Sequence, residues 1–147
     1  MIVAFTISLL LVAATIAIHY EALRQTSIRL VELPISPRAR IIAVLVVALV
    51  SHCLHTVLYA GVFLWMHKDG SFGDIGGAEE VLSFADAFYF SITSYTTLGI
   101  GDLFPHGALR IISGIEALNG LVMVGWTASF TYLTMERYWH IEPKKPT

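Results

Sequence analysis

The chain has 147 residues, of which 56% are hydrophobic and 14% are charged. Soluble domains average about 45–50% apolar and about 25% charged residues, so this composition argues against a water-soluble fold. The net charge of −2 offers no basic surface for nucleic acid, and the single cysteine, Cys53, excludes an internal disulfide framework and a cysteine-rich metal site. The mean hydropathy of +0.71 indicates a protein dissolved largely in lipid.

The first element is an uncharged stretch from Ile2 to Tyr20, and about 17 to 25 apolar residues suffice to cross the hydrocarbon core as a helix. A secretory signal peptide would usually have a basic segment and a cleavage site of small residues. Here apolar residues follow Met1 directly, and the stretch ends at His19 and Tyr20. We therefore expect a retained transmembrane helix over residues 1–20.

The segment 21–40 is expected to be a cytoplasmic linker, and it contains four of the nine basic residues. Pro34 and Pro37 are expected to end any helix within it. Two interpretations stay open for the residues before these prolines. One is a short amphipathic helix that lies on the inner leaflet, and the other is an ordinary polar connection with scattered apolar residues.

A pore domain is expected over residues 41–137, with two further spans. Residues 41–67 carry no charge and predict an outer helix. An inner helix is expected over residues 108–135, where the apolar stretch from Ile111 to Met135 is broken only by Glu116. Between the spans, the uncharged stretch from Ala87 to Gly101 is too short to cross and is rich in serine, threonine and glycine. It is expected to enter the membrane and return to the same side. Non-helical backbone is tolerated at this depth only where it is buried in protein or lines a water-filled cavity.

The distribution of charge predicts the orientation. Seven of the nine basic residues lie in the linker 21–40 and from Arg137 onward, so both regions are expected in the cytoplasm, including a tail over residues 138–147. The loop 68–82 carries four acidic residues and a single lysine, so it is expected outside, together with the N-terminus. The protein should therefore be a multi-pass protein of the plasma membrane, or of the inner membrane if bacterial.

The segment after the external loop carries the most specific pattern. Ser83 and Asp86 have the spacing of a capping box, which predicts a short helix over residues 84–96. Its C-terminal end would point to the membrane centre, where the helix dipole favours a cation. Glycine then alternates over residues 97–102, and its freedom of backbone angle lets successive carbonyl groups turn the same way. One strand offers too few oxygens for a dehydrated ion, so several copies around an axis are required.

These residues resemble a known family. The run from Ser91 to Pro105, SITSYTTLGIGDLFP, resembles the pore loop of potassium channels, whose signature is T-x-x-T-x-G-[YF]-G-[DN]. The resemblance covers Ile41 to Arg137 and not the first helix. It implies a homotetramer in membrane lipid, with K⁺ as the permeant ion and carbonyl oxygens of four filter loops in place of its water. It assigns ion binding to Thr97, Leu98, Gly99 and Ile100, and filter support to Thr96, Gly101 and Asp102.

Two filter positions depart from the family pattern. Ile100 stands where the family mostly has tyrosine or phenylalanine, and Leu98 where valine or isoleucine is common. In the family the aromatic hydroxyl ties the filter to aromatics of the pore helix, where this chain has Tyr89 and Phe90. Isoleucine cannot make that hydrogen bond, so permeation of K⁺ is a firmer expectation than rejection of sodium. A weakly selective cation channel remains an alternative.

The inner helix carries polar and small residues at membrane depth. Glu116 either faces the ion cavity and attracts cations, or in protonated form hydrogen-bonds the back of the short helix. Gly120 is expected to act as a hinge, with close helix packing as the alternative. Candidate cavity-lining residues on the face that Gly120 occupies are Leu121, Val124 and Ala128.

Two histidines of the outer helix support a rival hypothesis. His52 and His55 are three residues apart and, with Glu116, could form the metal site of a membrane metalloprotein. Hydrogen bonding between helices is the commoner reason for such residues, so no transition metal is expected. His106 at the outer mouth is either a sensor of external pH or simply exposed.

We therefore expect an all-α membrane protein with three transmembrane helices and a re-entrant helix and filter loop between the second and third. No bond chemistry and no cofactor are expected, so the protein should not be an enzyme. No span carries regularly spaced arginines, which argues against a voltage sensor. Gating should then come from the filter, the inner helices, lipid, protons or an unknown regulatory subunit. A channel-like scaffold that does not conduct is a further alternative.

Overall fold

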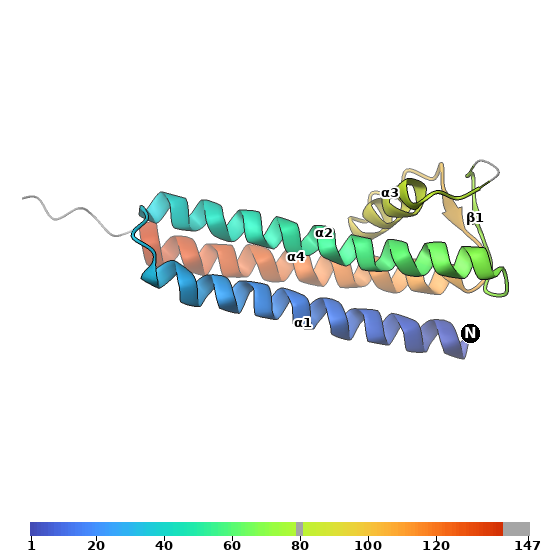
Figure 1. Cartoon of the computed structure of the whole chain (residues 1–147), viewed down its shortest axis with the longest axis horizontal. Coiled ribbons are helices and arrows are strands. Elements are labelled where there is room, and N and C mark those ends of the chain that lie inside the picture. The colour runs from blue at the N-terminus through green and yellow to red at the C-terminus, as the bar shows by residue number, and fades with distance from the viewer. Residues whose placement is uncertain (79–80, 140–147) are drawn as a thin grey trace, which may run out of the picture.

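The computed structural model describes residues 1–78 and 81–139, and Figure 1 shows the arrangement of its elements. In chain order these are α1 (Ile2–Glu32), α2 (Pro37–Asp69), β1 (Ile75–Gly76), α3 (Phe84–Tyr95), β2 (Phe104–Pro105) and α4 (Leu109–Trp139). Of these helices, α1, α2 and α4 are long and apolar enough to cross a membrane. The predicted all-helical protein with three long apolar helices and one short helix is confirmed for the described residues.

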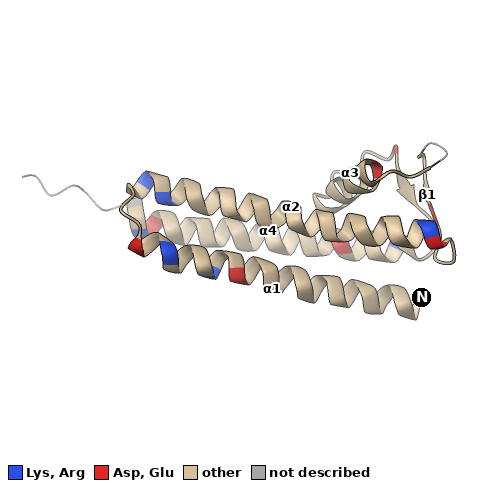
Figure 2. Cartoon of the chain, in the orientation of Figure 1, with Lys and Arg blue, Asp and Glu red and all other residues tan. Residues whose placement is uncertain are grey.

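The three long helices form one bundle in which α1 and α4 run antiparallel to α2 (Figure 1). The short helix α3 packs against α2 and α4 at the end of the bundle where the N-terminus lies. Figure 2 shows most of the basic residues of the helices at the opposite end, where α1 joins α2. The N-terminus and the α2–α3 loop therefore lie at one end of the bundle, and most of the basic residues of the helices lie at the other.

The first helix is longer than expected. Neither alternative predicted for the start of the linker is formed, because α1 continues through Tyr20 to Glu32 without a break. Helix formation does not stop at the membrane boundary, and this segment has no proline or glycine to end it. The helix ends at Leu33, which has extended angles (φ −78°, ψ 133°), as expected of a residue before a proline.

One face of α1 packs against α2 and α4. The buried residues recur every three or four positions, the spacing that places them on one face of a helix. Several of them are small or polar, which lets helices approach closely and hydrogen-bond within a membrane. They are Ala4, Ser8, Leu11, Thr15, His19, Leu23, Thr26 and Leu30.

Local sequence chemistry fixes where α2 and α3 begin. Ser36 caps α2 by accepting a hydrogen bond from the Ala39 backbone, and Pro37 occupies the first helical turn, where its missing N–H costs nothing. The predicted capping box of α3 is formed, with Ser83 accepting from the Asp86 backbone and Asp86 accepting from the Ser83 backbone. The helix α3 therefore begins at the predicted residue, whereas α2 begins at Pro37, before the predicted start at residue 41, because proline is well suited to the first turn of a helix.

The two short strands tie the external-loop segment to the chain that follows α3. They pair antiparallel, with Ile75 opposite Pro105. The backbones approach so closely that a Cβ on Gly77 would lie 1.9 Å from the Asp102 carbonyl oxygen, so only glycine fits there. The His106 Nδ1 atom lies 3.2 Å from a carboxylate oxygen of Asp74. These contacts hold the second half of the loop between α3 and α4 against the segment before α3.

Candidate functional site

The loop after α3 has an alternating backbone. Thr97, Gly99 and Gly101 have positive φ angles of 58°, 53° and 89°, whereas Leu98 and Ile100 between them do not have positive φ angles. The positive φ predicted for the two glycines is confirmed. Thr97 adopts the same region although it has a Cβ, at a cost of about 1–2 kcal/mol. This is the alternation expected to turn successive carbonyl groups to one side of a chain.

The loop is packed on one side and open on the other. Its amide groups bond back to the end of α3, with Thr97 N–H donating to the Ser94 carbonyl at 2.9 Å and Gly99 N–H donating to the Thr93 carbonyl at 3.1 Å. In contrast, Leu98 and Ile100 are 65% and 58% exposed. A single chain therefore anchors the loop from behind and leaves its other side uncovered.

Asp102 lies at the end of this loop. Its carboxylate accepts a hydrogen bond from the Leu103 N–H at 3.0 Å. Its bracing role, like the ion-binding roles of the loop residues, stays a prediction.

Glu116 is fully buried behind α3, which is the position that the hydrogen-bonding alternative requires. The Ser91 Oγ lies 2.5 Å from Glu116 Oε1 and 2.9 Å from the Thr56 carbonyl oxygen. A hydroxyl has one proton and a carbonyl can only accept. Both contacts are satisfied when protonated Glu116 donates to Ser91 and Ser91 donates to Thr56. The second carboxyl oxygen, Oε2, has no partner among the described residues.

Gly120 is the point of closest approach between α4 and the end of α3. A Cβ added there would lie 1.9 Å from the Tyr95 carbonyl oxygen, so the close-packing alternative has a direct structural basis. The helix α4 continues through this position without interruption. The proposed hinge stays a prediction, and so does cavity lining by Leu121, Val124 and Ala128, which are all exposed in the single chain.

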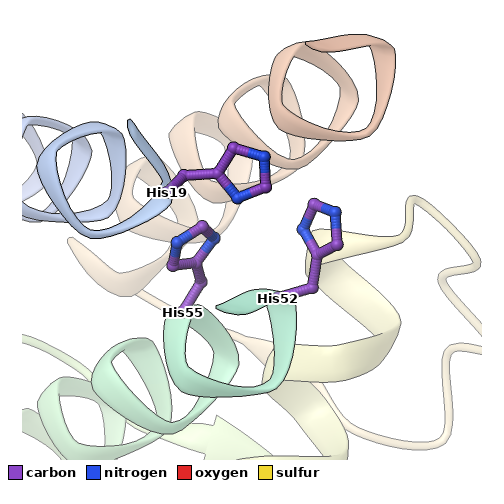
Figure 3. A group of neighbouring side chains, drawn as sticks. All are labelled: His19, His52 and His55. Atoms are coloured by element: carbon purple, nitrogen blue, oxygen red, sulfur yellow. The ribbon is translucent and has the colours of Figure 1, made fainter. Parts of the chain in front are cut away.

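The histidines of α2 meet a third histidine that the sequence analysis did not single out. His19 of α1 lies beside His52 and His55, and the three rings converge on a common space (Figure 3). His19 was missed because it was treated as the end of the first span. The signal that would have found it is its register with Thr15, Leu11 and Ser8 on the partly polar face of α1.

The three histidines form a closed ring of hydrogen bonds with three hydroxyl groups. Ser51 lies between His19 Nδ1 (3.0 Å) and His55 Nε2 (3.4 Å). The Tyr95 hydroxyl lies 2.9 Å from Nδ1 of both His55 and His52. Thr127 closes the ring, at 2.9 Å from His52 Nε2 and 3.0 Å from His19 Nε2.

This ring is complete as a hydrogen-bonded system. A neutral imidazole and a hydroxyl each offer one donor and accept at least one bond, so six groups in a cycle satisfy one another. The interhelical hydrogen bonding expected of His52 and His55 is thus confirmed, because both bond to Tyr95 of α3. The cycle joins all four helices, directly behind the residue at which α3 ends.

Comparison with known proteins gives one match. Residues 42–137 match the family model described as "Ion channel". The matched region contains most of α2, all of α3 and the loop that follows it, and α4 as far as Arg137. Neither a curated protein nor a solved structure matches the chain.

Proposed function

The chain belongs to the ion-channel family, and on that premise we propose that it is one subunit of a homotetrameric potassium channel that conducts K⁺ passively across a membrane. The loop after α3 carries this proposal. It joins the sequence TTLGIGD to alternating positive φ angles at Thr97, Gly99 and Gly101. Family membership and the three apolar helices make it a multi-pass membrane protein.

A tetramer supplies what one chain lacks. A K⁺ ion that loses its hydration water needs several oxygens around it, and potassium-channel filters provide them from four loops. Here one loop is anchored to α3 from behind and uncovered in front, where Leu98 and Ile100 are exposed. We assign ion-binding carbonyls to residues 97–100 and support of the filter to Thr96, Gly101 and Asp102.

The placement in the membrane follows from the same proposal. With the N-terminus and the loop before α3 outside, α3 begins at the outer interface and ends near the membrane centre. The basic end of the bundle (Figure 2) then lies in the cytoplasm, as the positive-inside rule requires. No bond chemistry and no enzymatic activity form part of this proposal.

A weakly selective cation channel is the second candidate, and Ile100 favours it. This side chain is 58% exposed and cannot donate a hydrogen bond to the aromatics of α3. Reversal potentials of the purified protein in liposomes, measured under opposed potassium and sodium gradients, separate the two candidates.

The decisive experiment is rubidium uptake into liposomes by the wild type and by Gly99→Ala. Alanine is strained at the φ of 53° that Gly99 adopts, and its methyl group would project from the uncovered loop, so uptake should fall at least tenfold. Gly61→Ala is the matched control, because Gly61 lies inside α2 with nothing within 4 Å of an added Cβ. Undiminished uptake by Gly99→Ala, or a purified assembly that is monomeric or dimeric, would refute the proposal.

A further inference from the structure

We propose that His19, His52 and His55 form a binding site for a divalent transition-metal ion of the zinc class, with the Tyr95 hydroxyl as the fourth ligand. The three histidines each offer a ring nitrogen, and these nitrogens lie within 4.8 Å of one another. The rings converge on one space, as Figure 3 shows. His19 and His55 are fully buried, so the site lies inside the helix bundle.

The spacing of the nitrogens is close to that of a loaded site. Zinc binds imidazole nitrogen at about 2.0–2.1 Å in tetrahedral geometry, which places two such nitrogens about 3.4 Å apart. From a spacing within 4.8 Å, each ring must move inward by about 1 Å or less. The proposal requires that rotation of the three side chains supply this movement. Imidazole ligands suit zinc, copper and nickel better than they suit magnesium or calcium.

The hydroxyl groups around the histidines fit the role of supporting partners. A ligating histidine usually gives its other ring nitrogen to a hydrogen-bond partner, which fixes the orientation of the ring. Here Thr127 contacts Nε2 of His52, and Ser51 contacts Nε2 of His55. These two contacts leave Nδ1 of both rings on the side that faces Tyr95, and they would hold the rings while Nδ1 binds the metal.

Tyr95 supplies the fourth ligand and offsets part of the charge. Its hydroxyl lies 2.9 Å from Nδ1 of both His52 and His55. On binding, the phenol gives its proton to the solvent and the phenolate oxygen bonds the metal, which lowers the net charge of the site from +2 to +1.

The site is not a feature of the matched family region. His19 lies on α1, and the family match covers residues 42–137 only. The site therefore forms only where α1 packs against the channel domain. A bound metal would join α1 to α2 and to the last residue of α3.

The test is metal binding by the purified full-length protein. The protein is stripped with a chelator, exposed to Zn²⁺ and desalted, and its metal content is measured by mass spectrometry. We expect one Zn²⁺ per chain, and Co²⁺ should give the intense visible absorption of a tetrahedral site. His19→Gln should weaken Zn²⁺ binding at least tenfold. Glutamine keeps a hydrogen-bond donor and an acceptor, so it preserves bonding to Ser51 or Thr127 while removing the ligand nitrogen.

Two further variants complete the test. His106→Gln is the matched control, because this exposed histidine pairs with Asp74 outside the helix bundle, and it should bind Zn²⁺ like the wild type. Tyr95→Phe should remove the phenolate-to-metal absorption band of the Cu²⁺-loaded protein. Equal helical circular dichroism and equal elution volume check that each variant is folded. Zn²⁺ binding that is absent from the wild type, or unchanged in folded His19→Gln, would overturn the proposal.

Metal binding is also expected to alter conduction, and this step rests on the proposed function. Tyr95 directly precedes Thr96 and Thr97, so a metal on its hydroxyl restrains the start of the filter loop. Zn²⁺ should therefore change rubidium uptake by the wild type and leave uptake by His19→Gln unchanged. If the wild type binds Zn²⁺ but its rubidium uptake is the same with and without Zn²⁺, this coupling is refuted. The binding measurement is independent of whether the channel conducts.

Discussion

Replacement of Gly120 by alanine tests how α4 packs against α3. The added Cβ would lie 1.9 Å from the Tyr95 carbonyl oxygen, whereas ordinary contact begins at 3.4 Å. The two helices must therefore separate by about 1.5 Å, or α4 must rotate. Overpacking of this kind typically costs about 1–3 kcal/mol of stability. The neighbouring atoms are backbone and cannot turn aside as a flexible side chain would, so we expect a value in the upper half of that range.

Gly125→Ala is the matched control, because it lies on the same helix with nothing within 4 Å of an added Cβ. It should stabilise the helix by about 0.5–1 kcal/mol, since alanine has the better helix propensity. The assay is thermal unfolding of the purified protein in detergent, with rubidium uptake measured on the same preparations.

The two measurements separate packing from hinge motion at Gly120. If packing decides, Gly120→Ala lowers the melting temperature and Gly125→Ala does not. If Gly120 serves only as a hinge, alanine would lower uptake and leave the melting temperature unchanged. A Gly120→Ala protein as stable as the wild type would therefore refute the packing argument.

Substitutions at three other positions give distinct outcomes. Glu116→Gln should change stability by no more than about 1 kcal/mol and leave rubidium uptake unchanged, because the amide still donates to Ser91. Glu116→Ala should lower the stability measured by thermal unfolding by about 2–3 kcal/mol. A large loss of uptake in the glutamine variant would contradict a neutral Glu116. Ile100→Tyr should raise the preference for K⁺ over Na⁺ in reversal potentials, and an already sharp selectivity that does not change would show that Ile100 is harmless. The pKa of Asp86 lies below its usual value because Ser83 donates hydrogen bonds to the carboxylate. The ionised carboxylate therefore stabilises the start of α3 at neutral pH. This stabilisation is lost as the pH falls below 3.8, the ordinary value, and through the lower pKa of the folded state. Ser83→Ala should remove that part of the acid dependence of the melting temperature, and an identical pH profile in the variant would count against it.

Local signals in the sequence were sufficient for the arrangement of helices along the chain. The three long helices follow from the length of apolar stretches, and the start of α3 follows from the capping pair Ser83 and Asp86. Glycine at positions 99 and 101 permits the positive φ angles that the loop adopts. Each of these depends on neighbours a few positions away, so a single sequence contains the information.

The extension of α1 beyond Tyr20 shows where such local reasoning misled. Charged residues were taken to mark the end of the helix, although charge ends a membrane span and not a helix. The buried positions Leu23, Thr26 and Leu30 continue the packing face of the preceding turns. Only Leu33 and the proline after it stop the helix, and that stop signal was present in the sequence.

The sequence by itself determined that the chain has three long apolar helices and one short helix, and which loop resembles a potassium-channel filter, but not that α1 continues beyond Tyr20. The tertiary structure alone decided which face of each helix meets its neighbours. Rotation of a helix about its axis depends on packing between segments far apart in the chain, such as His19 with His52 or Gly120 with Tyr95. For that reason Glu116 is found behind α3, and the three histidines come together only in the folded bundle.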